Sequence, residues 1–389
     1  MNVYAMTLAG KGAVTGVWTH MELAEQILRS HGVNYKILVH PVNLRPPPRS
    51  HQRAARLLAM LTRTPFEDNF FRWLVRPEMT RTLRGELKRS LPDVIHIHGT
   101  FCGGLLADFI NRAGIPWVVH IHSVDSELMR AAGHPPGHSM VDLADHLLQK
   151  SIEAATVSVA VSEDLKGRIA GLGIDVSGVR VIHNPIMLPC LPVLEGTSEE
   201  YVYLPARFSP EKGVDIALKA WALVEKKLPE VHLFIAGAGP EEGSLRSMAR
   251  DLGLARVRFL GSLSWERNMA WMAGSLFVLQ TTVPRGGFRE SCPLVTAEAM
   301  TLGKPVVTSD TGGGPEIMGD AGIQVPPFDH EALAGAIITL LRDETLRLKL
   351  AKMSEERARN LFDPGAYADR MMEVFDEAIA LASEGHRAL

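Results

Sequence analysis

Two glutamates eight positions apart stand at the start of a predicted helix in the second half of the chain. The stretch Leu294–Leu302 is typical of a helix because Pro293 suits a first turn and Gly303 suits a stop. Glu290 then lies in the loop before the helix, and Glu298 lies one turn inside it. Taken alone, the two acids also fit a surface helix residue and a chance loop acid.

The start of that helix has the chemistry of an anion site. Its first backbone amides, at Leu294 and Val295, have no acceptor within the helix, and the helix dipole is positive at this end. A diphosphate would be stabilised there. The carboxylate of Glu290 beside it would accept hydrogen bonds from sugar or ribose hydroxyls. The segment is therefore a candidate site for a phosphorylated ligand that carries hydroxyl groups.

Two cations follow the apolar run Tyr201–Leu204, which is typical of a strand. Arg207 and Lys212 stand in the loop between this strand and a helix predicted from about Val214. In open α/β sheets, ligands bind at the carboxyl ends of the strands. Apart from Glu211, no acid stands between or beside the two cations, so they suit a diphosphate, with the guanidinium supplying a bidentate fork. An ordinary solvated loop is the alternative.

Four histidines occupy alternate positions on two predicted strands, so the pair on each strand shares a face: His96, His98, His120 and His122. Such a cluster raises the question of a metal ion. The chain has no Asp-x-Asp motif, however, and the basic pair already answers the charge of a diphosphate. We therefore expect no metal. His98 and His122 should line a cleft, and His96 and His120 should be buried and hydrogen-bonded.

The elements that position these residues are short apolar runs separated by helix-length stretches. The runs are 3–8, 35–39, 94–98, 117–121 and 157–161 in the first half, and 201–204, 232–236, 257–260, 276–280 and 305–308 in the second. This alternation predicts parallel sheets covered on both faces. It occurs twice, and the break at 184–197 holds three prolines and a glycine, the composition of a linker.

We therefore predict two α/β domains, at residues 1–186 and 197–364. A chain of 389 residues suits two cores better than one. The last helical pattern, from about Pro364, has no strand after it. A terminal helix at about 365–389 could pack back on the first domain.

The segment Arg45–Arg89 departs from the alternation. It carries eleven Lys or Arg against four Asp or Glu, interleaved with leucines, phenylalanines and a tryptophan. A pair of amphipathic helices with a solvated basic face would explain it. The sharper hypothesis is a surface for an anionic acceptor or for an anionic membrane leaflet.

The composition of the chain excludes several classes of protein. With 46% hydrophobic and 22% charged residues it is that of an ordinary globular protein, and a net charge of −3 gives no argument for a nucleic-acid partner. The absence of a long apolar run argues against a membrane-spanning helix, and the start of the chain is more typical of a strand than of an export signal. Three scattered cysteines form neither a disulfide framework nor a zinc motif. We expect a cytoplasmic protein, and peripheral contact of the basic segment with the inner face of the membrane stays an alternative to a solvated face or an acceptor surface.

Taken together and in order, the motifs resemble glycosyltransferase family 4. In the second half they are Arg207 with Lys212-Gly213, Ile235-Ala-Gly-Ala-Gly239-Pro, Phe259-Leu-Gly261 and Glu290-x7-Glu298-Ala-Met-x-x-Gly-Lys-Pro. In the first half they are Gly16-x-x-x-His20-x-x-Leu23, Pro92-Asp-Val-Ile-His-Ile-His98-Gly, Val118-Val-His-Ile-His122, Val159-Ala-Val-Ser162-Glu and Val181-Ile-His-Asn184-Pro. The resemblance covers nearly the whole chain, and the Arg–Lys pair with Glu-x7-Glu is its specific part.

This resemblance implies the GT-B fold, in which two Rossmann-like, doubly wound parallel-sheet domains face each other across a cleft. It implies a retaining glycosyltransferase, a hexosyltransferase that moves a sugar from a nucleotide-diphospho-sugar, with a UDP- or GDP-sugar favoured and no metal or other cofactor. The acceptor would be a saccharide, a lipid-linked group or a small molecule, in glycan, lipopolysaccharide or exopolysaccharide biosynthesis. The first domain would bind the acceptor and the second the donor.

Two alternatives stay open. One is another enzyme of the GT-B class, such as a sugar-nucleotide epimerase or a phosphorylase. The other is a catalytically decayed protein that still binds nucleotide-sugars.

The resemblance also implies roles for individual residues. Arg207 and Lys212 would neutralise the donor diphosphate, which is the leaving group. Glu290 would face the donor sugar near its 3- and 4-hydroxyls. His122 would lie near the anomeric carbon, where it would hold the donor's 6-hydroxyl or orient the acceptor. These four are the predicted catalytic residues.

Further residues would bind the donor. Glu298 would bind the ribose hydroxyls, and the amides of Leu294 and Val295 would reach the diphosphate. Gly16, which has no Cβ, would let the backbone approach the phosphates from the other domain. Many members of the family have Gly-Gly where this chain has Thr15-Gly16, and Phe-Gly where it has Cys292-Pro293. The proline removes one N–H donor from the helix start.

Overall fold

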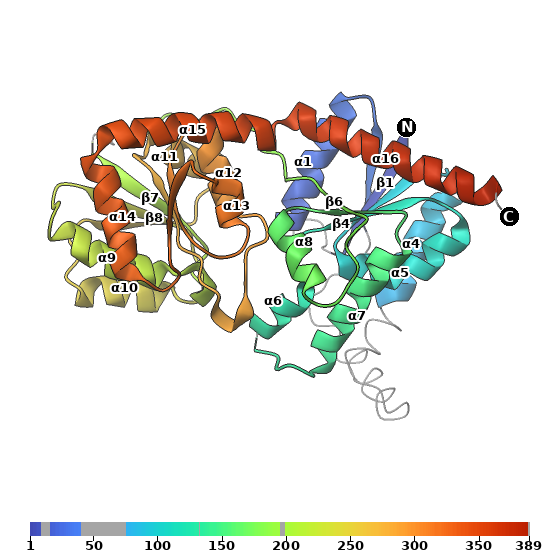
Figure 1. Ribbon diagram of the computed structural model, residues 1–389, viewed down its shortest axis with the longest axis horizontal. Coiled ribbons are helices and arrows are strands. Elements are labelled where there is room, and N and C mark those ends of the chain that lie inside the picture. Colours follow the sequence, from blue (N-terminus) through green and yellow to red (C-terminus); the bar gives the residue numbers. More distant parts are fainter. Residues whose placement is uncertain (9–15, 40–74, 132, 195–198, 388–389) are drawn as a thin grey trace. The chain divides into compact units, whose positions relative to one another are not determined.

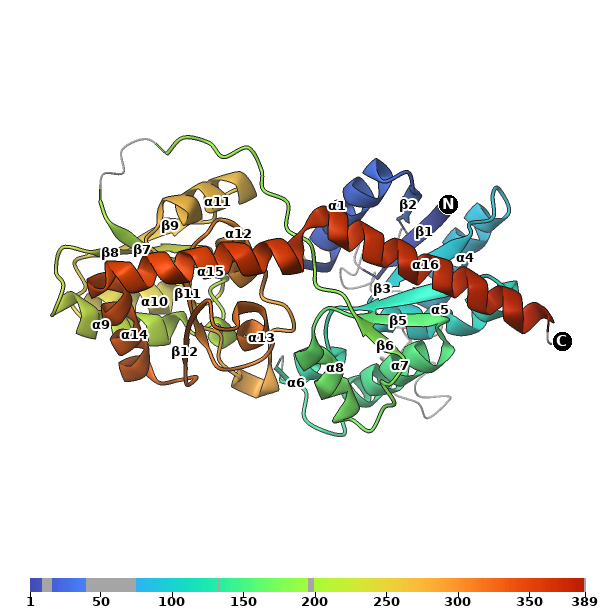
Figure 2. The same cartoon turned by 45° about the horizontal axis from the view of Figure 1, so that its top comes forward.

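The computed structural model describes residues 1–8, 16–39, 75–131, 133–194 and 199–387. They form two compact units. The first holds Met1–Pro185 and Pro364–Leu389, and the second holds Ile186–Asp363. In each unit, helices cover both faces of one sheet (Figures 1 and 2).

The first unit contains a six-stranded parallel sheet in the order β2-β1-β3-β4-β5-β6. Its strands are β1 (Asn2–Thr7), β2 (Asn34–Leu38), β3 (Val94–His98), β4 (Trp117–Ile121), β5 (Val157–Ala160) and β6 (Val179–Val181). The described helices are α1 (Gly16–Ser30), α4 (Arg76–Leu87), α5 (Thr100–Ala113), α6 (Asp125–Ala131), α7 (Ser139–Ala154), α8 (Glu163–Ala170) and α16 (Pro364–Arg387).

The second unit contains a parallel sheet in the order β12-β11-β10-β7-β8-β9. Its strands are β7 (Tyr201–Pro205), β8 (His232–Ala236), β9 (Val257–Gly261), β10 (Val278–Gln280), β11 (Val306–Ser309) and β12 (Gly322–Val325). Its helices are α9 (Val214–Glu225), α10 (Glu242–Asp251), α11 (Trp265–Gly274), α12 (Leu294–Thr301), α13 (Gly314–Met318), α14 (His330–Arg342) and α15 (Glu344–Phe362), with 3-10 turns η2 (Pro210–Lys212) and η3 (Arg285–Gly287).

The central strands are apolar because both of their faces are covered. Every residue of β3, β4, β7 and β8 is buried. The predicted α/β fold with doubly wound parallel sheets is therefore confirmed. The apolar runs read from the sequence match ten of the twelve strands within two residues. The two strands that the sequence did not reveal, β6 and β12, are short and lie at sheet edges.

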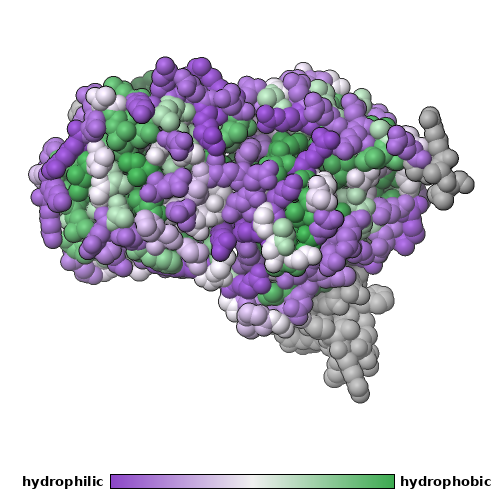
Figure 3. Space-filling model, in the orientation of Figure 1, coloured by the Kyte–Doolittle hydropathy of each residue, from purple (hydrophilic) through white to green (hydrophobic). Residues whose placement is uncertain are grey.

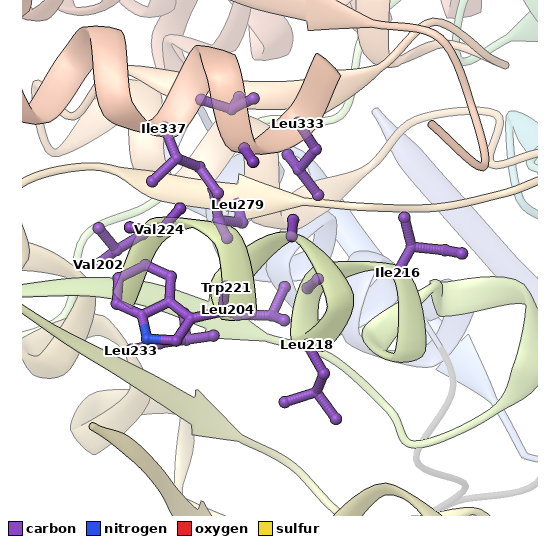
Figure 4. Packing of buried hydrophobic residues seen from close by; sticks show 14 of the residues in the cluster. Val202, Leu204, Ile216, Leu218, Trp221, Val224, Leu233, Leu279, Leu333 and Ile337 are labelled. Carbon is purple, nitrogen blue, oxygen red and sulfur yellow. The ribbon is translucent and has the colours of Figure 1, made fainter. Parts of the chain in front are cut away.

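The core of the second unit lies between its sheet and the helix pair α9 and α14. These helices pack side by side on one face (Figure 1). Trp221 of α9 and Ile337 of α14 are fully buried in the same cluster as the strand residues Leu204 and Leu279 (Figure 4). This packing holds the carboxyl ends of β7 and β10 in place.

The C-terminal helix α16 belongs to the first unit. It contacts α1 and strands β3, β4 and β5 of that unit's sheet. Tyr367, Met371 and Phe375 are buried along its inner side. The end of the chain therefore completes the cover of a sheet whose strands come from the first half.

Each sheet has a point where the order of its strands reverses, between β1 and β3 in the first and between β7 and β10 in the second. In open α/β sheets, ligands bind beyond the carboxyl ends of the strands at this point. His98 ends β3, the Arg207–Lys212 loop follows β7, and Gln280 ends β10. The topology thus brings the polar residues of the sequence motifs to the two binding edges.

On the face shown in Figure 3, hydrophilic residues lie over both units, with groups of apolar residues between them. Within the described ranges, no helix combines the length and the apolar character that crossing a membrane requires.

Candidate functional site

The loop after β7 holds its two cations against acids. The guanidinium of Arg207 donates to Glu211 over 2.7 Å and to Ser209 over 3.2 Å, while 68% of the arginine side chain stays exposed. Lys212, at the end of the same loop, forms an ion pair with Glu290. The sequence suggested cations with little acid nearby. That was wrong, because folding brings a distant glutamate to Lys212.

Glu290 is fixed by three partners. One carboxylate oxygen pairs with the Lys212 ammonium; the other accepts from Gln280 over 2.7 Å and from Thr282 over 2.6 Å. Burial by itself raises the pKa of the Glu290 carboxyl, but the charge of Lys212 and the hydrogen bonds outweigh it and lower the pKa below its usual value. Glu290 is therefore a carboxylate of defined orientation at neutral pH.

Contacts of backbone groups hold the loop that carries Lys212 against the loop that carries Glu290. The hydroxyl of Thr281 donates to the Lys212 carbonyl over 2.8 Å. Gly213 has φ +63°, and a Cβ there would overlap the carbonyl oxygen of Thr281. On the other side, the Gly313 amide donates to the Glu290 carbonyl over 2.8 Å. The Val283 amide donates to the Glu211 carbonyl over 2.8 Å, so the ion pair sits between loops whose backbones are themselves in contact.

Helix α12 begins at Leu294, as predicted, with Pro293 at the cap position rather than in the first turn. Pro293 is extended at the cap position, and its carbonyl accepts from the amides of Thr296 and Ala297. Leu294 and Val295 are the first two helical residues, so their amides have no acceptor within the helix. They follow Glu290 by four and five positions, so two amides without a helical acceptor stand close in the sequence to the fixed carboxylate.

Glu298 faces a tryptophan. The indole N–H of Trp265, the first residue of α11, donates to the Glu298 carboxylate over 3.0 Å. Burial raises the pKa of Glu298 to about 7, and the hydrogen bond from Trp265 opposes the rise. Because 44% of Trp265 is exposed, this partner can move away when a hydroxyl-bearing ligand arrives.

The histidines of the first unit gather in one cluster. Nδ1 of His98 lies 3.1 Å from Nε2 of His122, and the hydroxyl of Tyr35 lies 2.9 Å from Nδ1 of His96 and 3.0 Å from Nε2 of His98. Burial lowers the pKa of His96 and His122 to about 3. These imidazoles are therefore neutral at neutral pH.

His120 differs from the expectation. The sequence suggested that it would be buried and hydrogen-bonded, and it is fully buried, but neither ring nitrogen has a hydrogen-bond partner within the part of the chain that the structure describes. Its neighbours are other imidazoles, with the rings of His120 and His122 centred 4.7 Å apart. The hydrogen-bonding part of the prediction was wrong because the ring packs against other imidazoles and forms no hydrogen bond with them.

A cavity of about 450 Å³ lies beside this cluster, within the first unit. His98 and His122 border it, together with Asp125 at the start of α6. Asp125 accepts from the hydroxyls of Ser123 over 2.9 Å and of Thr100 over 3.2 Å. Burial raises the pKa of Asp125, and these hydrogen bonds oppose the rise. No Lys or Arg is among the described residues that border the cavity.

Two predictions fall partly or wholly on residues that the structure does not describe. Gly16 begins α1, but the loop before it, residues 9–15, lies outside the described ranges. Most of the basic segment Arg45–Arg89 also lies outside them. Of its described part, Arg76 pairs with Asp108 and Arg89 with Glu86.

Two family models match the chain in succession. The model described as "Glycosyl transferase 4-like domain" matches residues 15–185, and the model described as "Glycosyl transferases group 1" matches residues 193–360. Together they cover most of the chain. The chain belongs to glycosyltransferase family 4. The resemblance read from the motifs is thereby confirmed, and the protein is an enzyme that transfers glycosyl groups.

Individual proteins resemble this chain in sequence or in fold. A phosphatidyl-myo-inositol mannosyltransferase of Mycobacterium leprae is 26% identical over 376 residues, which cover 95% of this glycosyltransferase and 95% of that protein. The fold resembles that of sucrose-phosphate synthase from Thermosynechococcus elongatus (TM-score 0.75, 18% identity, 98% of this chain and 100% of that one). It also resembles that of Anabaena HepE in complex with UDP (TM-score 0.68, 20% identity, 97% and 100%).

The geometry adds residues of this glycosyltransferase that the sequence argument missed. Gln280 and Thr282 hold Glu290, and Trp265 caps Glu298. A signal for the first two was present, since they are polar residues that end an apolar strand at the reversal point of the sheet. Trp265 left no such signal, because only tertiary packing brings α11 to α12.

Proposed function

We propose that this glycosyltransferase takes its sugar from a nucleotide-diphospho-sugar, transfers it with retention of the anomeric configuration and needs no metal ion for that reaction. The Lys212–Glu290 ion pair carries the proposal. It places an ammonium for the diphosphate and a fixed carboxylate for the sugar in direct contact, at the reversal point of the second sheet.

In the proposed mechanism, the donor replaces contacts that the protein makes with itself. A diphosphate would draw Lys212 and Arg207 away from Glu290 and Glu211, because it offers two negative charges to both cations. The departure of Lys212 frees one oxygen of Glu290 for a sugar hydroxyl. Thr282 and Gln280 keep the other oxygen, so the carboxylate retains its orientation. Binding of the diphosphate and release of the Glu290 oxygen for the sugar would then happen in the same step.

The start of α12 would complete the diphosphate site. The amides of Leu294 and Val295 and the positive end of the helix favour an anion there. Glu298, one turn further on, would accept from the ribose hydroxyls once Trp265 gives way. These groups would stabilise the leaving diphosphate as charge develops on it in an oxocarbenium-like transition state, which is the main catalytic effect that we propose.

His122 would act on the sugar as a neutral imidazole, because burial lowers its pKa to about 3. A neutral ring can hold the donor's 6-hydroxyl or orient the acceptor hydroxyl. In front-face attack, the leaving phosphate takes the acceptor's proton, so no strong base is required of His122.

For the acceptor, we propose a hydroxyl of a saccharide or a lipid-linked group in glycan biosynthesis. The name of the M. leprae relative, which is 26% identical, gives phosphatidyl-myo-inositol as that protein's acceptor. This supports including acceptors that carry a phosphate. Contact of the basic segment Arg45–Arg89 with an anionic membrane belongs to the same proposal.

The test begins with the donor. A thermal-shift screen with UDP, GDP, ADP and dTDP and their sugars should single out one nucleotide, because bound ligand adds stability in proportion to the logarithm of its concentration over Kd. The selected donor is then incubated with neutral and phosphate-bearing acceptors in the presence of a chelator, and the anomeric configuration of the product is read by NMR. A product with the donor's configuration is expected. An inverted product, or a reaction that the chelator stops, would contradict the proposal.

A further inference from the structure

Four histidines of the first unit surround one point. His20 of α1, His98 at the end of β3, His120 of β4 and His122 directly after it each offer a ring nitrogen, and these four atoms lie within 4.8 Å of one another. All six distances between the ring centroids fall between 4.7 and 5.5 Å. The rings therefore occupy the corners of a nearly regular tetrahedron.

That spacing matches an ion held by four imidazoles. A Zn²⁺ ion bound at about 2.1 Å to each ring would separate the ring centroids by roughly 5 Å and the ligand nitrogens by roughly 3.4 Å. Nδ1 of His98 and Nε2 of His122 already lie 3.1 Å apart. The planes of His98, His120 and His122 lie within 16° of one another, so these rings must turn toward the common centre when an ion binds tetrahedrally.

Several nitrogens of this cluster have no partner. Nδ1 of His20 and both ring nitrogens of His120 are buried, and no hydrogen-bond partner for them is found in the described ranges. Buried polar atoms are nearly always paired, so each exception requires an explanation. A central ion would pair with His20 and with one nitrogen of His120.

Two tyrosines stand where the outer partners of metal-binding histidines usually stand. The hydroxyl of Tyr35 lies 3.0 Å from Nε2 of His98, and that of Tyr367 lies 3.2 Å from Nε2 of His20. A metal-binding histidine commonly gives its other N–H to an oxygen acceptor such as a carboxylate, a carbonyl or a water, which fixes the tautomer, and here a tyrosine oxygen would take that place. With the proton on Nε2 facing a tyrosine oxygen, Nδ1 of His20 and of His98 are the ligand atoms.

We propose that His20, His98, His120 and His122 form a binding site for Zn²⁺, beyond the reaction proposed above. Four neutral imidazoles suit Zn²⁺, whereas Mg²⁺ and Ca²⁺ prefer oxygen ligands. Four protein ligands close the site, which is typical of a structural or regulatory zinc rather than a catalytic one. The cavity bordered by His98, His122 and Asp125 gives the ion an entry path and a carboxyl group near it.

Bound zinc would change the role of His122. The Nε2 atom that faces His98 would become a metal ligand, and the ring would be fixed toward the cluster. If His122 orients the sugar as proposed, zinc holds it away from that task, and the site is inhibitory. This consequence rests on the proposed function; the binding itself does not.

The test measures metal uptake by the full chain, after removal of any affinity tag and treatment with a chelator. Zn²⁺ is titrated in competition with a chromophoric chelator, and Co²⁺ is followed by its visible absorption, which is intense in a tetrahedral site. We expect one equivalent of Zn²⁺ and a tetrahedral Co²⁺ spectrum. Failure to bind one equivalent, or a weak octahedral spectrum, would overturn the proposal.

Three variants assign the site. His120→Gln removes a ligand and should weaken Zn²⁺ binding by at least about 100-fold, and Tyr367→Phe removes an outer partner and should weaken it by about 10–100-fold. His232→Gln is the matched control, since His232 is a buried histidine on β8 of the second unit, outside the cluster, and it should bind as the wild type does. Unchanged binding in the first two variants would place the ion elsewhere. If His120→Gln does not fold, as judged by its thermal transition, Tyr367→Phe decides.

Discussion

Glu290 and Lys212 form an ion pair across 78 positions of sequence. It joins the loop after β7 to the loop before α12, and within the described ranges neither side chain forms a second ion pair. An incoming diphosphate would compete for the lysine while the glutamate remains held by two uncharged donors. The ion pair is therefore an arrangement that a donor can open without losing the geometry of the carboxylate.

The hydroxyl of Thr282 should matter for catalysis because it holds Glu290 when Lys212 leaves. The Thr282→Val substitution keeps the shape of the side chain and removes the hydroxyl group that donates to Glu290. A hydrogen bond to a charged group contributes about 1.5–3 kcal/mol, so kcat/KM for the donor should fall by roughly 10–100-fold. Steady-state kinetics at saturating acceptor measures this.

Thr339→Val is the matched control, since that hydroxyl bonds only to the Gly335 carbonyl on the surface of α14. Its kinetics should equal those of the wild type. Equal kinetics for Thr282→Val would mean that Glu290 does not need this donor.

Donor affinity should depend on pH near neutrality because burial raises the pKa of Glu298 to about 7. The ionised carboxylate accepts more hydrogen bonds than the protonated acid. If it binds the ribose, Kd for the nucleotide-sugar should fall as the pH rises from 6 to 8. Calorimetric titration measures this, with the nucleotide-sugar itself, whose diphosphate does not titrate in this range.

In Glu298→Gln the same titration should be weaker and flat with pH. A steep pH dependence that survives in this variant would show that another group causes it.

The free energy of unfolding should depend on pH in the opposite direction from donor affinity, and should fall as the pH rises. An acid whose pKa is higher in the folded state favours folding while it is protonated, so this contribution is present below the unfolded pKa of about 4.5 and is lost as the pH rises to about 7. Glu298→Gln should therefore gain free energy of unfolding relative to the wild type over this window, by up to about 3 kcal/mol. Urea unfolding at several pH values measures the difference. A difference that is constant with pH would refute the raised pKa.

Gly213 should contribute to the stability of the second unit. Its φ of +63° disfavours any residue with a Cβ, and that atom would overlap the Thr281 carbonyl. Gly213→Ala should cost about 2–4 kcal/mol, from the backbone conformation and from overpacking together. Gly335→Ala in the middle of α14 meets nothing within 4 Å and should stabilise by up to about 1 kcal/mol. Thermal unfolding compares the two, and equal melting temperatures would contradict the account.

Much of the fold was predictable because buried parallel strands leave continuous apolar runs in the sequence. The buried strands β3, β4 and β8 were predicted with their bounds. The edge strands β6 and β12 were not, since they are three and four residues long and only one residue in each is buried. Too little of either strand faces the core to mark its sequence.

The site was predictable as a set of charges but not as a set of contacts. No pattern in the sequence pairs Lys212 with Glu290, because that contact depends on how β7 and β10 lie side by side. His20 belongs to the Gly16-x-x-x-His20-x-x-Leu23 motif, and its place among the other histidines became visible only once α1 was placed on the sheet. The sequence shows which residue types are present, but it does not show which residues they contact in the folded protein.

The most direct test of the central claim is the donor kcat/KM of Lys212→Ala, measured beside Lys219→Ala. Lys219 is an exposed lysine on α9, seven positions further along the chain, and its loss should change nothing. If Lys212 neutralises the leaving diphosphate, kcat/KM for the donor should fall by at least about 100–1,000-fold, and Arg207→Ala should follow in the same direction. A Lys212→Ala enzyme with near-normal kcat/KM would contradict the proposed donor site.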